Sequence, residues 1–138
     1  MGVDGLAERL DALGDERLVR RARHVVTEDA RVLDACVALR EDDFRTLGGL
    51  MTASHASMRD DYEFTEASVD LTVEVALANG ATGARMTGGG FGGCVLVLTP
   101  VEALDAIGAA VSAAFADSGR DAPATFVARP AAGAGRLS

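Results

Sequence analysis

The sequence predicts an α+β domain in which helices pack on a small antiparallel sheet. Apolar residues recur at helical spacing through the first half of the chain. A glycine-rich loop then separates two short segments of strand character, and another helical pattern follows it. The chain has 138 residues and no linker long enough to divide it, so we expect a single domain with its own core.

Local signals place the expected elements along the chain. Asp15 has the character of a helix N-cap, Thr65 that of a second cap, and Asn79-Gly80 marks a helix end. The segment 94–98 is apolar at every position, so we expect both faces of this strand to be covered. Thr99-Pro100-Val101-Glu102 resembles a capping box with proline at the first helical position. The expected order is helices at 14–40, 42–60 and 65–79, strand–glycine loop–strand at 83–98, a helix at 100–118 and a strand at 124–129.

Composition excludes several classes of function. The net charge of −8 argues against non-specific binding to nucleic acid or to an anionic membrane. No apolar run approaches the length of a membrane span, and the charged N-terminal stretch has no signal-peptide character. Two cysteines without a CxxC motif fit a reducing cytoplasm. The chain contains no lysine, which excludes every mechanism that needs one.

The segment TGGGFGG carries the strongest candidate for a site. Its glycines satisfy G-x-G-x-x-G, but a strand follows where the dinucleotide fingerprint requires a helix. The protein-kinase lid and the P-loop both need a lysine that is absent. Two interpretations stay open: a tight hairpin, or a loop whose free amides receive an anion or a second loop. The candidate active-site residues are Thr87, Gly88, Gly89, Gly90, Phe91, Gly92 and Gly93.

Other polar residues are expected to be structural. Ser54 and His55 are adjacent, but neighbours on a helix point about 100° apart, and Ser54 falls on the apolar stripe. Asp60 and Asp61 are more typical of a helix end than of a metal site. No catalytic residue and no metal site is therefore predicted within this chain. Three residues are assigned to the margin of the site or to a domain interface: Arg85, His55 and Arg59.

Four segments resemble one family of kinases. GARMTGGGFGGC (83–94) is similar to the third motif of the GHMP small-molecule kinases, in the form that galactokinases carry. Further galactokinase-like segments occur in the family's order: RRARHVVTEDARVL (20–33), LMTASHASMRDDYE (50–63) and, at the C-terminal end, FVARPAAGAG (126–135). The resemblance covers nearly the whole chain and implies the fold of the GHMP kinase C-terminal domain.

The resemblance also implies a function, but several motifs that this function needs are missing from the chain. Galactokinases transfer a phosphoryl group from Mg-ATP to the anomeric hydroxyl of galactose. Their sugar-binding signature, serine-rich phosphate loop and catalytic aspartate have no counterpart here. The resemblance therefore implies the C-terminal part of a cytoplasmic galactokinase-like enzyme, inactive alone. Its partners would be the N-terminal kinase half, which mainly binds ATP and Mg²⁺, and a galactose-type sugar.

Three alternatives remain. The chain could be a non-catalytic sugar-sensing or partner-binding protein with a kinase-derived fold, although retention of the glycine loop argues against this. It could belong to a different GHMP kinase, although the RDDYE segment favours galactokinase. A truncated gene product is the third alternative, and it predicts an exposed apolar face where another domain would dock.

Overall fold

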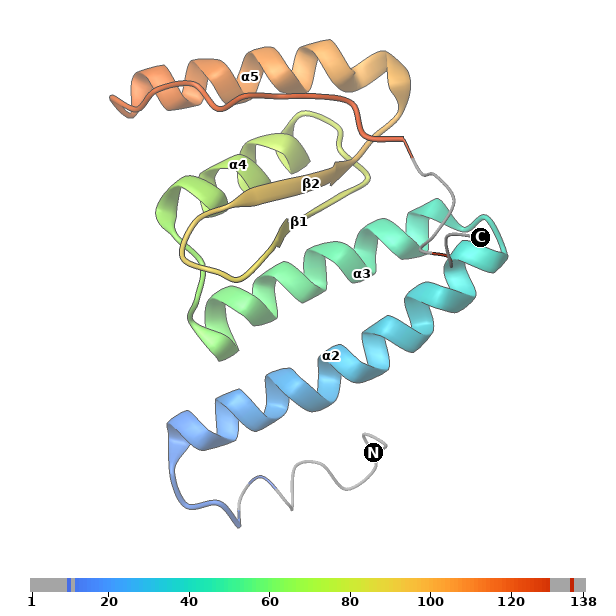
Figure 1. The fold of residues 1–138 in the computed structure, drawn as a ribbon, viewed down its shortest axis with the longest axis vertical. Helices are drawn as coiled ribbons and strands as arrows, with labels where there is room; N and C mark the ends of the chain where they lie inside the picture. Colours follow the sequence, from blue (N-terminus) through green and yellow to red (C-terminus); the bar gives the residue numbers. More distant parts are fainter. Residues whose placement is uncertain (1–9, 11, 130–134, 136–138) are drawn as a thin grey trace.

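The computed structural model describes residues 10, 12–129 and 135. Its elements are α2 (Glu16–Arg40), α3 (Phe44–Ser57), the π-helical turn η1 (Met58–Tyr62), α4 (Ala67–Ala78), β1 (Gly83–Thr87), β2 (Cys94–Leu98), the 3₁₀ turn η2 (Val101–Ala103) and α5 (Leu104–Asp117). In Figure 1, α2 and α3 lie side by side, the strand pair follows next to α3, and α4 and α5 lie beyond it. Among these helices, none combines the length and the apolar character needed to cross a membrane.

Side-chain caps begin the first two helices. The carboxylate of Asp15 accepts hydrogen bonds from the amides of Arg17 and Leu18, at 2.8 and 3.1 Å. Asp43 accepts one from the amide of Thr46 at 3.0 Å. These bonds satisfy donors that have no partner within the first helical turn.

Two expected caps are wrong. The residue that precedes α4 is Glu66, and the Thr65 hydroxyl instead donates to Asp70 at 3.3 Å. No side chain caps η2 or α5, and the Thr99 hydroxyl donates to the carbonyl of Pro100. Hydroxyl side chains have several acceptors within reach, so the tertiary surroundings decide which one they use.

The two strands form an antiparallel pair whose register runs from Gly83 opposite Leu98 to Thr87 opposite Cys94. One face of this pair packs against α4 and α5. The larger buried cluster consists of Val73, Ala76, Ala84, Ile107, Val111 and Phe115. A second cluster, beside the glycine loop, consists of Met58, Val69 and Met86, with Phe64 and Val95 packed against it.

The expectation that both faces of β2 are covered is wrong for the described part of the chain. Cys94 is exposed, and Leu96 keeps 48% of its surface accessible. The side chains of Val95 and Val97 point to the other face and pack on the core of α4 and α5. An apolar run is compatible with a strand that is covered on both faces. Burial of the second face also requires another element to pack on it, and the run itself does not specify that element.

Helix α3 is fixed against β1 through backbone contact between two glycines. A methyl group on Gly83 would lie 2.2 Å from the carbonyl oxygen of Gly48, and one on Gly48 would lie 2.2 Å from the carbonyl oxygen of Thr82. Only residues without a side chain permit this approach. The contact sets the position of the strand that leads into the glycine loop.

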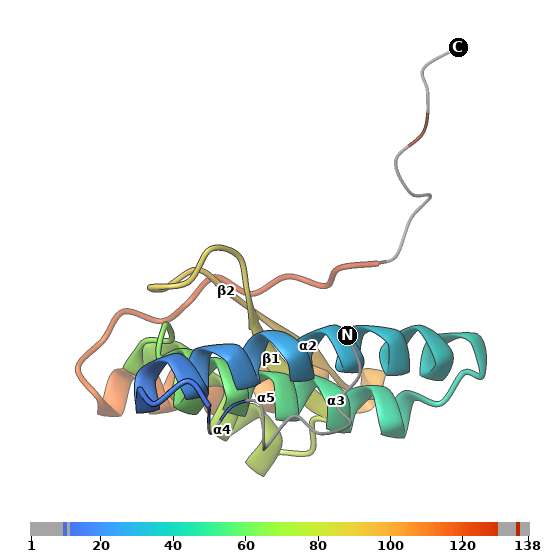
Figure 2. The ribbon, with the colours of Figure 1, turned by 90° about the horizontal axis from the view of Figure 1, so that it is seen from below.

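The strand predicted at 124–129 is not formed. These residues belong to an extended segment that pairs with no strand in the described chain, and Figure 2 shows it outside the strand pair. Phe126 and Val127 are 82% and 64% exposed. Alternation of apolar and polar residues is compatible with a strand, but a strand also needs a neighbour for its backbone hydrogen bonds.

Candidate functional site

The glycine-rich loop, residues 88–93, joins β1 to β2 in an unusual backbone conformation. The φ angle is +108° at Gly88 and +90°, +55°, +111° and +106° at residues 90 to 93 in turn. Glycine reaches these angles without steric cost, whereas other residues rarely do. The conformation therefore accounts for four of the five loop glycines.

The loop presents unused hydrogen-bond donors. Within the described residues, no amide of the five loop glycines donates to another protein group. Thr87, at the start of the loop, is exposed and adds a hydroxyl. Successive free N–H groups in a turn make a concave surface that attracts anions or carbonyl oxygens. The loop is thus chemically suited to receive a phosphate group or the backbone of a second loop.

Phe91 is the exception within the loop. It is a bulky residue at a left-handed φ angle, and its side chain is 74% exposed. Its amide donates to the carbonyl of Phe64 at 2.9 Å. A bulky residue persists in this conformation only where its surroundings hold it there. The bond to Phe64 is such a constraint, and it fixes the middle of the loop.

The ring of Phe64 also packs against the loop, at Gly90. A methyl group on Gly90 would lie 2.3 Å from Cδ2 of the Phe64 ring. The ring of Phe64 in turn packs edge-on against Tyr62, with centroids 4.9 Å apart, and Tyr62 lies 4.8 Å from the ring of His24. The guanidinium of Arg21 lies 5.2 Å from the centroid of Tyr62. A chain of aromatic contacts therefore connects the loop to α2.

His55, on α3, contacts the root of the loop. Its Nδ1 accepts a hydrogen bond from the amide of Met86 at 3.3 Å, and Met86 comes directly before Thr87. Its Nε2 lies 3.2 Å from Oδ1 of Asp70 on α4. Neither of these two atoms has a hydrogen-bond partner among the described residues. The ring is only 3% exposed.

The electrostatic surroundings keep His55 neutral. Burial lowers the pKa of His55 because the protonated ring would lose its hydration, and the nearby carboxylate of Asp70 opposes this effect without overcoming it. A neutral imidazole carries one hydrogen. Since Nδ1 accepts from Met86, we assign that hydrogen to Nε2, which faces Asp70.

The two candidate arginines are paired with the chain's own carboxylates. Arg59 forms two hydrogen bonds to Asp60, at 2.8 and 3.0 Å, and is partly exposed. Arg85 donates to the carbonyl of Met86 at 3.1 Å and lies 3.9 Å from a carboxylate oxygen of Glu28. Ser54 donates to the same carboxylate at 2.5 Å. These contacts place Arg85 at the root of the loop and leave Arg59 bound to its neighbour.

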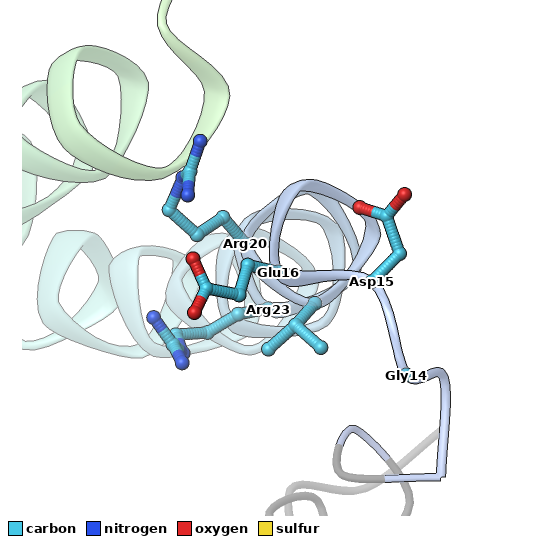
Figure 3. A pocket seen from close by; sticks show the side chains of 6 residues that line it. Gly14, Asp15, Glu16, Arg20 and Arg23 are labelled. Atoms are coloured by element: carbon cyan, nitrogen blue, oxygen red, sulfur yellow. The ribbon is translucent and has the colours of Figure 1, made fainter.

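A hollow of about 410 Å³ lies elsewhere, at the start of α2 (Figure 3). Three of its four charged side chains are already engaged. Asp15 caps the helix, Arg20 pairs with Glu63 at 3.0 Å, and Arg23 pairs with Asp61 at 3.1 Å. These pairs join α2 to the segment that follows α3, so the hollow is the rim of a structural contact.

The described residues contain no cluster of three or more potential metal ligands. Asp60 is bound by Arg59, and Asp61 accepts from Arg23 and from the Ser57 hydroxyl. Both aspartates lie in the π-helical turn that follows α3. The described part of the chain therefore offers no set of oxygen ligands for Mg²⁺, although the glycine loop fits an anionic group.

Comparison with known proteins identifies the class of fold and site. The profile described as GHMP kinases C terminal matches residues 35–117. The chain belongs to the GHMP kinase family, and the predicted resemblance and fold class are confirmed.

Within this family, the relatives are galactokinases. Galactokinase from Streptomyces coelicolor is 48% identical over 146 residues, which cover 99% of this chain and 38% of that protein. Galactokinase from Mycobacterium tuberculosis is 48% identical over 130 residues, 94% of this chain and 36% of that protein. The crystal structure of Lactococcus lactis galactokinase complexed with galactose gives a TM-score of 0.81 at 38% identity, covering 86% of this chain and 31% of that one. The chain thus spans less than two fifths of the length of these relatives.

Sequence reasoning located the loop but missed two residues that support it. The sequence predicts no role for Phe64 and places Asp70 only within the helix expected at 65–79. Their roles depend on contacts with Gly90, Phe91 and His55, which come from other elements. No spacing along the chain signals such contacts.

Proposed function

We propose that this chain is the C-terminal part of a galactokinase-type phosphotransferase and contributes one wall of its active site. The observation that carries the proposal is the glycine loop, which offers five amides without a partner among the described residues, in a chain that belongs to the GHMP kinases. The sugar substrate is inferred from the names of the relatives. The reaction would move the terminal phosphoryl group of ATP to a hydroxyl of a galactose-type sugar.

The role of the loop would be electrostatic. Phosphoryl transfer depends mainly on positioning and on stabilising charge on the transferred group. The free amides and the Thr87 hydroxyl are neutral donors at fixed positions, suited to phosphate oxygens or to a second loop that wraps them. In the complete enzyme, Mg-ATP would supply the phosphoryl group, and its Mg²⁺ would neutralise part of the negative charge. Because the described residues lack a ligand cluster for Mg²⁺, we assign the metal to the N-terminal half.

We also propose that the chain is inactive alone. His55 is buried, and His24 packs on Tyr62 and contacts the Ser57 hydroxyl at 3.0 Å. Asp60 and Asp61 are engaged by arginines. None of these residues is free to act as a base for a sugar hydroxyl, which agrees with the proposal that the catalytic aspartate comes from the other half.

The outer face of α2 supports a role for a partner. An amphipathic surface helix normally turns polar residues to solvent. On α2, six apolar side chains are between 49% and 65% exposed: Leu18, Val25, Val32, Leu33, Val37 and Leu39. We propose that the N-terminal half of the kinase docks on this face.

We place the complete enzyme in the cytoplasm, where ATP is available and the two free cysteines stay reduced.

Complementation tests the proposal. The purified chain would be assayed for ATP-dependent phosphorylation of galactose alone and after coexpression with the part of Streptomyces coelicolor galactokinase that lies outside the aligned region. We expect no turnover by either part alone and measurable turnover by the complex. Galactose analogues and unrelated GHMP kinase substrates would define the acceptor.

Other outcomes would redirect the assignment. Turnover by the chain alone would contradict the proposal that the base lies in the other half. A stable complex that binds galactose without turnover would favour the sugar-sensing alternative. Turnover with a different acceptor only would place the chain in another branch of the family.

A further inference from the structure

A buried histidine in contact with the loop has no role in the proposed reaction, because it cannot reach a ligand. His55 is 3% exposed and lies among the buried residues of α3. Its two ring nitrogens face groups from two other elements, the Met86 amide on β1 and the Asp70 carboxylate on α4. A buried polar side chain is costly unless its polar atoms are satisfied, so this arrangement needs an explanation.

We propose that His55 is a positioning residue that fixes the root of the glycine loop, and that Asp70 keeps it in the tautomer that accepts from Met86. This inference rests on the proposed function only for the identity of the group that the loop binds. The positioning itself is a property of the chain.

The loop needs an anchor at its root because its own sequence provides little rigidity. Glycine has more backbone freedom to lose on ordering than any other residue. The middle of the loop is fixed by Phe64, through the amide of Phe91 and the close contact of Gly90. At the root, the strand pair holds Thr87 opposite Cys94, and the bond from the Met86 amide to His55 ties the same end of β1 to α3.

Histidine suits this position because one rigid ring can contact two elements at once. Nδ1 can accept from Met86 only when the hydrogen is on Nε2. Asp70 favours that tautomer by placing a carboxylate oxygen 3.2 Å from Nε2. The other oxygen of Asp70 accepts from the Thr65 hydroxyl at 3.3 Å, which orients the carboxylate. The order of the loop thus depends on a residue of α4 that does not touch it.

The first experiment measures amide hydrogen exchange by NMR in the 138-residue chain without nucleotide or sugar. The reporters are the Met86 amide, bonded to His55, and the Phe91 amide, bonded to Phe64. In His55→Leu we expect both to exchange about tenfold faster, the effect of one lost hydrogen bond. In His55→Gln we expect protection to return, because the side-chain amide can accept from Met86 and donate to Asp70. Ser112→Ala removes a side-chain hydrogen bond within α5, away from the loop, and is the control that should leave both amides unchanged.

The second experiment reads the tautomer directly. Ring ¹⁵N shifts of His55, assigned by their loss in His55→Gln, should show the neutral form with hydrogen on Nε2. Asp70→Ala should increase the share of the other tautomer and accelerate exchange of the Met86 amide. If His55→Leu does not fold, the comparison of Asp70→Ala with His55→Gln still decides the question.

Two results would overturn the inference. One is a wild-type ring with its hydrogen on Nδ1. The other is equal protection of Phe91 in the Leu and Gln variants, which would show that His55 only fills space. Neither measurement involves turnover, so failure of the complementation assay leaves this inference intact, and its own failure leaves the proposed kinase function intact.

Discussion

At the scale of single residues, the residues of the glycine loop differ in how closely other groups surround them. Gly90 has a φ angle of +90° and lies against the Phe64 ring, and Phe91 is held in a left-handed conformation by a bond to the same residue. Gly89, next to them, has open space around its α-carbon. The loop glycines therefore differ in how much they are needed for folding.

Substitution of Gly90 should be costly. Gly90→Ala would place a methyl group 2.3 Å from the Phe64 ring, at a φ angle that L-residues rarely adopt. We expect a loss of about 1–3 kcal/mol in the free energy of unfolding, measured by urea titration. The matched control Gly89→Ala should change stability by less than about 0.5 kcal/mol. Equal effects of the two substitutions would contradict the contact with Phe64.

The two histidines predict how stability depends on pH. Burial lowers the pKa of both His24 and His55 from the ordinary 6.5. In the unfolded chain both rings gain protons as the pH falls through about 6.5, whereas the folded chain resists this, so the unfolded state binds more protons. Stability should therefore decrease from about pH 7.5 to about pH 5.5.

Urea titration across this range is the measurement, and the double variant His24→Gln, His55→Gln should flatten the profile. The carboxylates with lowered pKa, such as those of Asp60 and Glu63, which arginines stabilise in the charged form, titrate at lower pH and do not contribute here. Stability that rises on acidification would show that the rings gain protons more readily in the folded state.

At the scale of elements, the junction of α3 with β1 determines where the loop begins. Gly48 and Gly83 bring the two backbones into contact, and His55 adds the bond to Met86 seven residues further along α3. The π-helical turn after α3 is followed by Glu63, which has a left-handed φ angle of +59° and is bound by Arg20 and Arg21. Phe64 follows directly and reaches the loop.

A methyl group at this junction should separate the elements. In Gly83→Ala the new atom would lie 2.2 Å from a backbone oxygen of Gly48, which cannot move like a side chain. We expect a loss of about 1–3 kcal/mol or more by urea titration, with faster exchange of the Met86 amide. Gly49→Ala is the control, because the neighbouring glycine of the same helix faces open space and should gain about 0.5–1 kcal/mol. A neutral effect of Gly83→Ala would contradict the close contact.

At the scale of the whole molecule, two apolar surfaces are exposed in the described part of the chain. One is the outer face of α2, and the other is the face of β2 that includes Leu96. An exposed apolar face is what the truncated-product alternative predicts, and it equally fits docking of a kinase half. Both interpretations agree with a chain that spans less than two fifths of its relatives.

Charge on the α2 face should weaken docking without unfolding the chain. Leu33 and Val25 are 65% and 59% exposed, so Leu33→Glu with Val25→Glu should change the free energy of unfolding by less than about 0.5 kcal/mol per site. We expect these changes to reduce copurification with the coexpressed N-terminal part and to lower complemented turnover. Val101→Glu, at an 80% exposed position before α5, is the control. Unchanged copurification would exclude α2 as the docking face.

The sequence by itself determined the helices, the strand–loop–strand unit, the family and the position of the loop, because these depend on local periodicity, on glycine content and on motifs contiguous in the chain. Only the tertiary structure decided which contacts those elements make. Segment 124–129 alternates like a strand but has no strand partner in the described chain, and Cys94 is exposed although its run is apolar. His55, Asp70 and Phe64 meet the loop from separate elements. Pairing, burial and support of a loop need atoms distant in sequence, and one-dimensional patterns do not specify where those atoms lie.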